Sequence, residues 1–182
     1  SGKTFGIIGF GNIGKRVAKI AEALEMKVLI ASRYPDSAFE TKSISFTSLD
    51  GLLSAADVIS LHCPLTEENK GFINSAAISK MKDGVILLNT SRGPLLNEED
   101  LARALKSGKV SAAGLDVLSA EPPEVGNPLL GIPNCVITPH IAWITREARI
   151  RLIDTAVANL EAWLTGKNIN CVNLKSSRTL DR

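Results

Sequence analysis

The chain has 182 residues, of which 45% are hydrophobic and 22% charged, and its formal net charge is +2. These values are typical of one globular domain and give no basis for a nucleic-acid partner. The sequence contains no apolar stretch of membrane-spanning length and no signal peptide, so we expect a cytoplasmic protein without a membrane partner. The three cysteines are widely spaced, which predicts reduced thiols and no metal site.

An apolar run at residues 5–8 leads directly into the motif Gly9-x-Gly11-x-x-Gly14, and a helical pattern follows it. A strand, a glycine turn and a helix in this order are the setting of the dinucleotide-binding fingerprint. Gly9 permits the tight turn, Gly11 lets the backbone approach a pyrophosphate, and Gly14 lets the helix pack closely on the strand. Free N–H groups and the helix dipole favour phosphate here. We therefore expect NAD or NADP as the cofactor.

The remaining sequence predicts strands that alternate with helices. We expect strands at 27–31, 44–46, 57–61, 84–89, 110–115 and 135–138, and helices after residue 14 and at 48–53, 74–81, 97–109 and 145–164. This alternation predicts a doubly wound, Rossmann-type parallel sheet with helices on both faces. The run 84–89 is continuously apolar, as in a strand buried on both faces. We assign 1–174 to this domain and expect 175–182 to be a disordered tail.

The end of the second strand reads the adenosine ribose in this fold. An acidic residue there accepts the 2′-hydroxyl and favours NAD, whereas an arginine favours the 2′-phosphate of NADP. Ser32 and Arg33 stand at this position, and the first carboxylate beyond them is Asp36. The sequence therefore favours NADPH. The alternative is that Arg33 stacks on adenine or lies in solvent.

Three polar residues, Arg92, Glu121 and His140, follow three separate predicted strands, so we expect them to meet at the ligand-binding edge of the sheet. Hydride transfer to a ketone leaves an alkoxide that needs a proton, which an imidazole with its ordinary pKa of about 6.5 can donate. The Glu121 carboxylate would favour the imidazolium and fix its tautomer. Arg92 would bind the carboxylate of a 2-oxo acid. Asp116 is expected to accept the nicotinamide carboxamide N–H₂, and His62 to be a structural or cofactor-edge residue.

Three stretches now resemble the D-isomer-specific 2-hydroxyacid dehydrogenases: GFGNIG at 9–14, MKDGVILLNTSRG at 81–93, and GLDV through EP to PHIA within 114–142. The resemblance extends from residue 2 to about residue 173, and the Trp143 that follows is most like the glycerate dehydrogenase or hydroxypyruvate reductase branch. It implies that Arg92, Glu121 and His140 are catalytic. The residues expected to contact the cofactor are Gly9, Gly11, Asn12, Ile13, Gly14, Ser32, Arg33, Cys63, Pro64, Thr90, Ser91, Asp116 and His140.

The resemblance implies an oxidoreductase of the EC 1.1.1 class that reduces a small 2-oxo acid, such as hydroxypyruvate or glyoxylate, to the D-2-hydroxy acid. Two alternatives remain. One is a formate or phosphite dehydrogenase, which Glu121 disfavours because the resemblance implies a Gln–His pair in formate enzymes. The other is a nucleotide-sensing module of the corepressor type. Family members carry a substrate domain before the fingerprint, and the resemblance implies that this domain is absent from the 182 residues. We therefore expect this chain to form a homodimer that binds the cofactor but has a low catalytic turnover.

Overall fold

The computed structural model describes residues 1–172, and its internal contacts divide the chain into two units, 1–141 and 142–182. Each unit is described by itself. The tail expected at 175–182 lies outside the described residues. None of the helices within 1–172 is long and apolar enough to cross a membrane.

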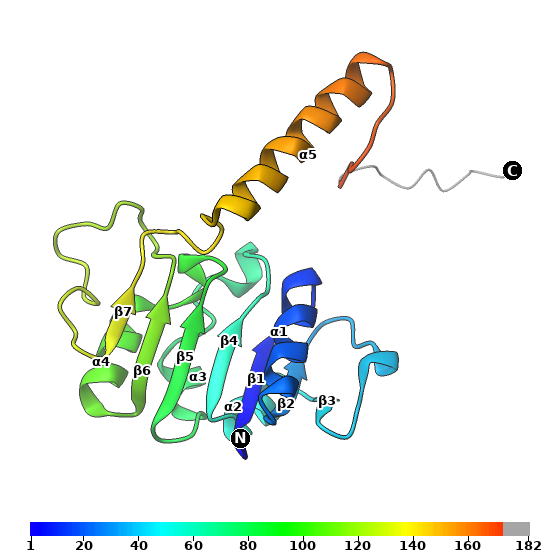
Figure 1. Ribbon diagram of the computed structural model, residues 1–182. Coiled ribbons are helices and arrows are strands. Elements are labelled where there is room, and N and C mark those ends of the chain that lie inside the picture. Colours follow the sequence, from blue (N-terminus) through cyan, green and yellow to red (C-terminus); the bar gives the residue numbers. More distant parts are fainter. Residues whose placement is uncertain (173–182) are drawn as a thin grey trace, which may run out of the picture. The chain divides into compact units, whose positions relative to one another are not determined.

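The first unit is built on a sheet of seven parallel strands in the order β3-β2-β1-β4-β5-β6-β7 (Figure 1). The strands are β1 (Thr4–Ile8), β2 (Lys27–Ala31), β3 (Ile44–Phe46), β4 (Val58–Leu61), β5 (Val85–Asn89), β6 (Val110–Leu115) and β7 (Cys135–Ile137). The strand order reverses between β1 and β4, and in open parallel sheets a crevice forms at the carboxyl ends of two such strands. The predicted doubly wound fold is confirmed.

Helices cover both faces of this sheet. They are α1 (Asn12–Ala23), α2 (Leu49–Ala55), α3 (Ser75–Ser79) and α4 (Glu98–Ser107), with short 3-10 turns η1 (Ser37–Phe39), η2 (Glu67–Asn69) and η3 (Gly93–Leu95). In Figure 1, α1 lies in front of the sheet, against β1 and β2, and α2, α3 and α4 lie behind it. The side chains of Ser48, Asn74 and Asn97 cap α2, α3 and α4 by accepting a backbone N–H.

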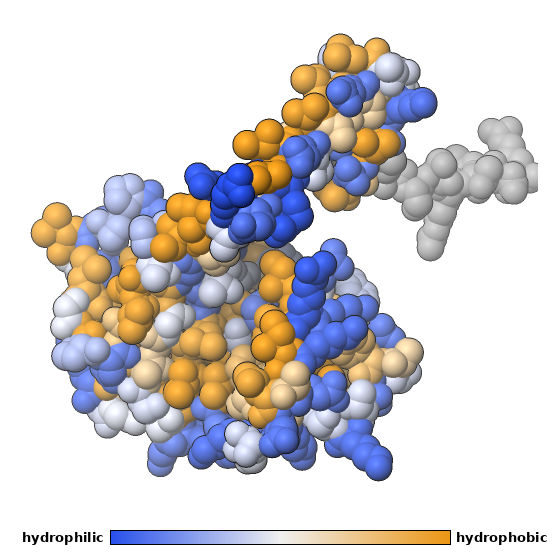
Figure 2. All heavy atoms as spheres, viewed as in Figure 1, coloured by the Kyte–Doolittle hydropathy of each residue, from blue (hydrophilic) through white to orange (hydrophobic). Residues whose placement is uncertain are grey.

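The expectation that β5 is buried on both faces is wrong. Leu87 is fully buried beneath the rear helices, but Ile86 on the other face is 37% exposed. The reason is that α1, the helix on this face within the described part of the first unit, packs mainly on β1 and β2 and leaves Ile86 on the front of β5 exposed. Figure 2 shows hydrophobic surface on this front side of the unit. A continuously apolar strand therefore does not report how many of its faces are covered inside its own unit.

The second unit contains α5 (Arg146–Leu164), which Thr145 caps through a hydrogen bond from the Ala148 N–H. The structure confirms the helix expected at 145–164, and the apolar side chains of this helix are exposed. No residue of α5 is buried, and its exposed large hydrophobic side chains are Ile150, Leu152, Ile153, Val157, Leu160, Trp163 and Leu164. Five of them, from Ile150 to Leu164, follow one another at spacings of three or four residues, which is the pattern of one stripe, and Leu152 and Trp163 lie to one side of it and widen it.

Candidate active site

The residues singled out from the sequence follow six different strands of the first unit. Gly9 follows β1, Ser32 follows β2, His62 follows β4, Thr90 follows β5, and two acidic residues, Asp116 and Glu121, come after β6. His140 comes after β7. Because all seven strands are parallel, these positions share the carboxyl edge of the sheet, where ligands bind in folds of this type.

The three glycines of the fingerprint have different reasons to lack a side chain. Gly9 has φ of +97°, and a Cβ there would overlap the backbone of Cys63. A Cβ on Gly14 would overlap the carbonyl oxygen of Gly9. Gly11, in contrast, has φ of −84°, and no described atom lies within 4 Å of where its Cβ would be. The packing of the chain therefore requires Gly9 and Gly14, whereas Gly11 leaves room for a group outside the chain.

The start of α1 fits a pyrophosphate at this open space. Gly11 is the N-cap of α1, and among the described residues no side chain accepts the first N–H groups of the helix. The first turn carries no acidic residue that would oppose an anion. Ile13 in this turn is 65% exposed. Unsatisfied N–H groups at the positive end of a helix dipole favour phosphate, so a dinucleotide fits these residues.

The corner after β2 contains charged side chains that are already paired. The Ser32 hydroxyl accepts the Tyr34 N–H at 3.1 Å, which turns the chain away from β2. The Arg33 guanidinium lies 3.2 Å from the Glu68 carboxylate in η2. Lys15 at the start of α1 lies 3.3 Å from Asp36. Sequence reasoning missed Glu68, because the separation of 35 positions between it and Arg33 hides their proximity.

The turn after β5 is shaped by Asn89, a fully buried residue that sequence reasoning also missed. The Asn89 amide donates to the Arg92 carbonyl at 2.9 Å and accepts the Ser91 N–H at 3.0 Å. The Ser91 hydroxyl in turn donates to the Cys63 carbonyl at 2.6 Å, which joins this turn to the loop after β4. Arg92 is thereby held at the strand end, and its guanidinium donates to the Ser91 carbonyl at 2.6 Å. A polar residue ending an apolar strand is the one sequence signal for Asn89.

The loop after β4 holds the second histidine and a cysteine. The His62 ring nitrogen Nε2 lies 2.8 Å from the Ser60 hydroxyl, and burial lowers the pKa of His62. Burial also raises the pKa of the Cys63 thiol. Both side chains are therefore held in their neutral forms near neutral pH, which agrees with a structural or cofactor-edge position for His62.

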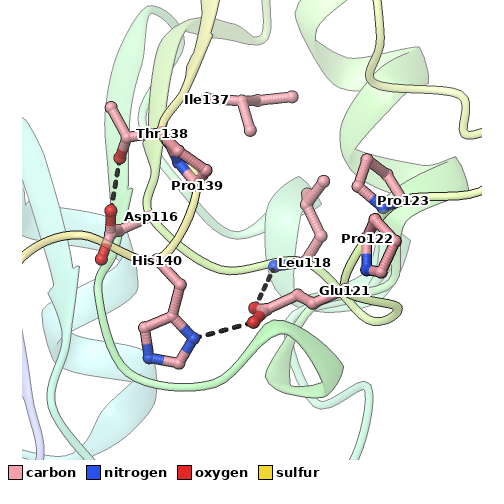
Figure 3. A pocket seen from close by; sticks show the side chains of 9 residues that line it. All are labelled: Asp116, Leu118, Glu121, Pro122, Pro123, Ile137, Thr138, Pro139 and His140. Carbon is pink, nitrogen blue, oxygen red and sulfur yellow. Dashed lines mark hydrogen bonds and ion pairs between the residues drawn. The ribbon is translucent and has the colours of Figure 1, made fainter.

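Glu121 and His140 form the contact that the sequence predicts. His140 Nδ1 lies 2.7 Å from Glu121 Oε2, and Glu121 Oε1 accepts the Leu118 N–H at 3.1 Å (Figure 3). The hydrogen bond from His140 is the main cause that lowers the pKa of Glu121, and the Leu118 N–H adds to it against a smaller opposing effect of burial. Glu121 is therefore ionised near neutral pH, with its carboxylate held toward the imidazole.

Asp116 fixes the loop that carries His140. This residue is 5% exposed, and its Oδ1 accepts the Thr138 hydroxyl at 2.5 Å and the Ile141 N–H at 2.9 Å. Its backbone carbonyl accepts the His140 N–H at 2.9 Å, and His140 has φ of +55°, a costly value for a residue other than glycine. Sequence reasoning missed Thr138. The role of Asp116 toward the carboxamide stays a prediction.

These side chains line a cavity of about 360 Å³. Its walls are Asp116, Leu118, Glu121, Pro122, Pro123, Ile137, Thr138, Pro139 and His140. In Figure 3 the imidazole of His140 and the carboxylate of Glu121 point toward each other, from the loops after β7 and β6. The arrangement places an acid–base group beside an apolar wall, which suits proton exchange with a small bound molecule.

Comparison with known proteins gives a consistent answer. Residues 1–142 match the model of the family "D-isomer specific 2-hydroxyacid dehydrogenase, NAD binding domain". The chain is 57% identical over 172 residues to a hydroxypyruvate reductase of Blautia hydrogenotrophica, covering 94% of this chain and 53% of that protein. It is 44% identical over 174 residues to a glycerate dehydrogenase of Methylorubrum extorquens, again covering 94% of this chain and 53% of the relative.

Among solved structures, a D-lactate dehydrogenase with NAD⁺ from Lactobacillus jensenii superposes with a TM-score of 0.85 at 31% identity, over 92% of this chain and 54% of that one. The chain spans about half the length of the curated relatives it matches. The family match begins before the glycine loop and ends just beyond His140, so it contains the whole edge described above. The chain therefore belongs to the D-isomer specific 2-hydroxyacid dehydrogenases and carries their NAD-binding domain.

Proposed function

We propose that this chain is the nucleotide-binding part of an NAD(P)H-dependent reductase of small 2-oxo acids, with hydroxypyruvate and glyoxylate as substrates. The observation that carries the proposal is the 2.7 Å contact between His140 and Glu121 at the carboxyl edge of the sheet. The hydroxypyruvate reductase and glycerate dehydrogenase among its relatives support this substrate class.

The proposed chemistry assigns one task to each of three side chains. The bound nicotinamide cofactor would supply the hydride. Glu121 accepts the hydrogen on Nδ1 of His140, so the other nitrogen, Nε2, is the one that donates a proton to the forming alkoxide. In the reverse direction Nε2 takes the proton from the hydroxyl. The Arg92 guanidinium binds the substrate carboxylate through its planar pair of donors.

For the cofactor we propose that the pyrophosphate lies against residues 9–14, with the remaining contacts at the ends of β2, β4, β5 and β6. The open space beside Gly11 and the uncapped start of α1 support this position. We propose NADPH as the preferred form, because no carboxylate follows β2 directly and Arg33, although it pairs with Glu68, is an exposed cation at the position that would meet the 2′-phosphate.

We further propose that residues 1–174 act as one nucleotide-binding domain within a longer cytoplasmic polypeptide, which forms a homodimer through this domain. The relatives are about twice as long as the part of them that this chain matches, which supports a second domain that closes over the substrate.

The test is the reduction of hydroxypyruvate by the full-length protein that contains this chain. The variant His140→Ala should lose roughly 10²–10⁴-fold in kcat, the usual contribution of a general acid, while it still binds the dinucleotide. Glu121→Gln should also lose activity, and Glu124→Gln on the same loop is the matched control. Unchanged turnover in His140→Ala would exclude His140 as the acid, whereas the absence of turnover in the wild-type full-length protein would favour a nucleotide-sensing module.

A further inference from the structure

An ion pair bridges the two sides of the adenosine end of the proposed cofactor site. The Arg33 guanidinium nitrogen Nη2 lies 3.2 Å from Glu68 Oε2. Both side chains are well exposed, at 63% for Arg33 and 81% for Glu68, so a ligand can reach them. In the first unit, Arg33 is the cation that follows β2, the strand whose end reads the adenosine ribose.

The backbone around both partners is fixed next to the glycine loop. The Gly9 N–H donates to the Ala31 carbonyl at 2.9 Å, which joins the loop after β1 to the end of β2. On the other side, the Asn69 amide donates to the Pro64 carbonyl at 2.8 Å and accepts the Thr66 N–H at 2.7 Å. These bonds hold η2, and with it Glu68, against the loop after β4.

The Arg33 guanidinium also affects the loop after β4. The charge of Arg33 acts on the Cys63 thiol, lowering a pKa that burial otherwise raises. The ion pair with Glu68, which lies in η2 beyond β4, places Arg33 close to the loop after β4 as well as to β2. Since β2, β1 and β4 are neighbours in the sheet, the Arg33–Glu68 pair spans the end of β1, where the dinucleotide is proposed to bind.

A 2′-phosphate and the Glu68 carboxylate would compete for the same guanidinium. The phosphate monoester of NADPH carries between one and two negative charges near neutral pH, whereas NADH has an uncharged hydroxyl at that position. A phosphate bound to Arg33 would displace Glu68 or lie next to a like charge. The pair therefore disfavours NADPH selectively, and it does not change the contacts that both cofactors share.

We propose that Glu68 is a specificity-determining residue, which lowers the preference for NADPH over NADH by pairing with Arg33. This inference rests on the proposed position of the cofactor. The same corner holds a second pair, Lys15 with Asp36 at 3.3 Å, so two of its cations already have a carboxylate partner. Removing Glu68 exposes an unopposed guanidinium to the phosphate.

The experiment titrates this chain with NADPH and with NADH, followed by nicotinamide fluorescence. Glu68→Gln should raise the ratio of NADPH to NADH affinity about fivefold, which corresponds to about 1 kcal/mol. The change should shrink at high ionic strength, because exposed charges are screened. Glu67→Gln, the adjacent exposed carboxylate of η2, is the matched control, and Glu68→Asp keeps the charge and should keep the wild-type ratio.

The variants separate two ways of failing. If Glu68→Gln leaves the ratio within twofold of wild type, or raises it equally in an Arg33→Ala background, the role of Glu68 is excluded while the cofactor site stands. If neither dinucleotide binds with saturation, the proposed cofactor site is wrong and the inference is overturned with it.

Discussion

Single residues at the amino end of the sheet matter for stability rather than for chemistry, and Asp57 is the main example. Its Oδ2 accepts the Thr4 N–H at 2.8 Å, and its Oδ1 lies 3.1 Å from Lys82. The hydrogen bond from Thr4 is the main cause that lowers the pKa of Asp57, with Lys82 adding to it against desolvation. The ionised carboxylate thus ties the start of β1 to the start of β4.

The sign of the pH dependence follows from this shift. A carboxyl group with a lowered native pKa stabilises the fold above its ordinary pKa of about 3.9, and the contribution is lost as the pH falls through the native value. Asp57→Asn should lower the free energy of unfolding by about 1 kcal/mol at pH 7, and the difference from wild type should disappear at acidic pH. Urea unfolding of the variant and of wild type, at neutral and at acidic pH, measures this difference in the free energy of unfolding.

Asp50→Asn is the control for this prediction, since the Asp50 carboxylate pairs with Lys80 at the exposed surface and should contribute less. A gap between Asp57→Asn and wild type that stays the same at both pH values would show that the charge of Asp57 does not stabilise the fold.

At the scale of the element, different glycines of the loop at 9–14 serve packing and ligand binding. Gly14→Ala puts a Cβ against the Gly9 carbonyl oxygen and should destabilise the fold by about 1–3 kcal/mol. Gly11→Ala meets no described atom within 4 Å and has an ordinary φ, so it should destabilise the fold by no more than about 1 kcal/mol, the usual cost of alanine at an N-cap.

Dinucleotide binding should be weakened directly by the Gly11 substitution. Gly11→Ala should weaken NADPH and NADH affinity by about tenfold or more, because the methyl group occupies the space assigned to the pyrophosphate. Thermal unfolding and fluorescence titration of the two variants measure both effects. Normal affinity in Gly11→Ala would show that the phosphates do not lie against this loop.

Local patterns predicted the elements well because their signals are local. The caps at Ser48, Asn74 and Asn97 and the packing of Gly14 on Gly9 depend on neighbours within a few residues, although Gly9 itself packs against the distant Cys63. The Glu68 partner of Arg33 was not predictable, because its position depends on how the loops after two different strands are placed. The exposure of Ile86 was missed for a related reason, since it depends on which strands α1 covers.

For the whole molecule, the exposure of the candidate acid–base pair is the decisive feature. Within the first unit the side chains of His140 and Glu121 are 45% and 40% exposed. Hydride transfer is favoured where water is excluded from the reacting groups. The chain spans about half the length of its curated relatives, so the proposed second domain would supply the missing cover.

We therefore expect this chain to bind the dinucleotide but to reduce hydroxypyruvate at least about 100-fold more slowly than the full-length protein that contains it, a difference of about 2.7 kcal/mol in the activation barrier. The comparison of kcat/KM for the two proteins measures it. Equal values would mean that the described edge is a complete active site on its own.

The most direct test of the central claim follows the hydride itself. The full-length protein is supplied with hydroxypyruvate and a reduced cofactor that carries deuterium at its transferable position, and the product is examined by mass spectrometry, NMR and chiral analysis. The account predicts D-glycerate with deuterium on the carbon that was the ketone, formed by wild type and lost with His140→Ala. No reduced product, or a product without deuterium at that carbon, would contradict it.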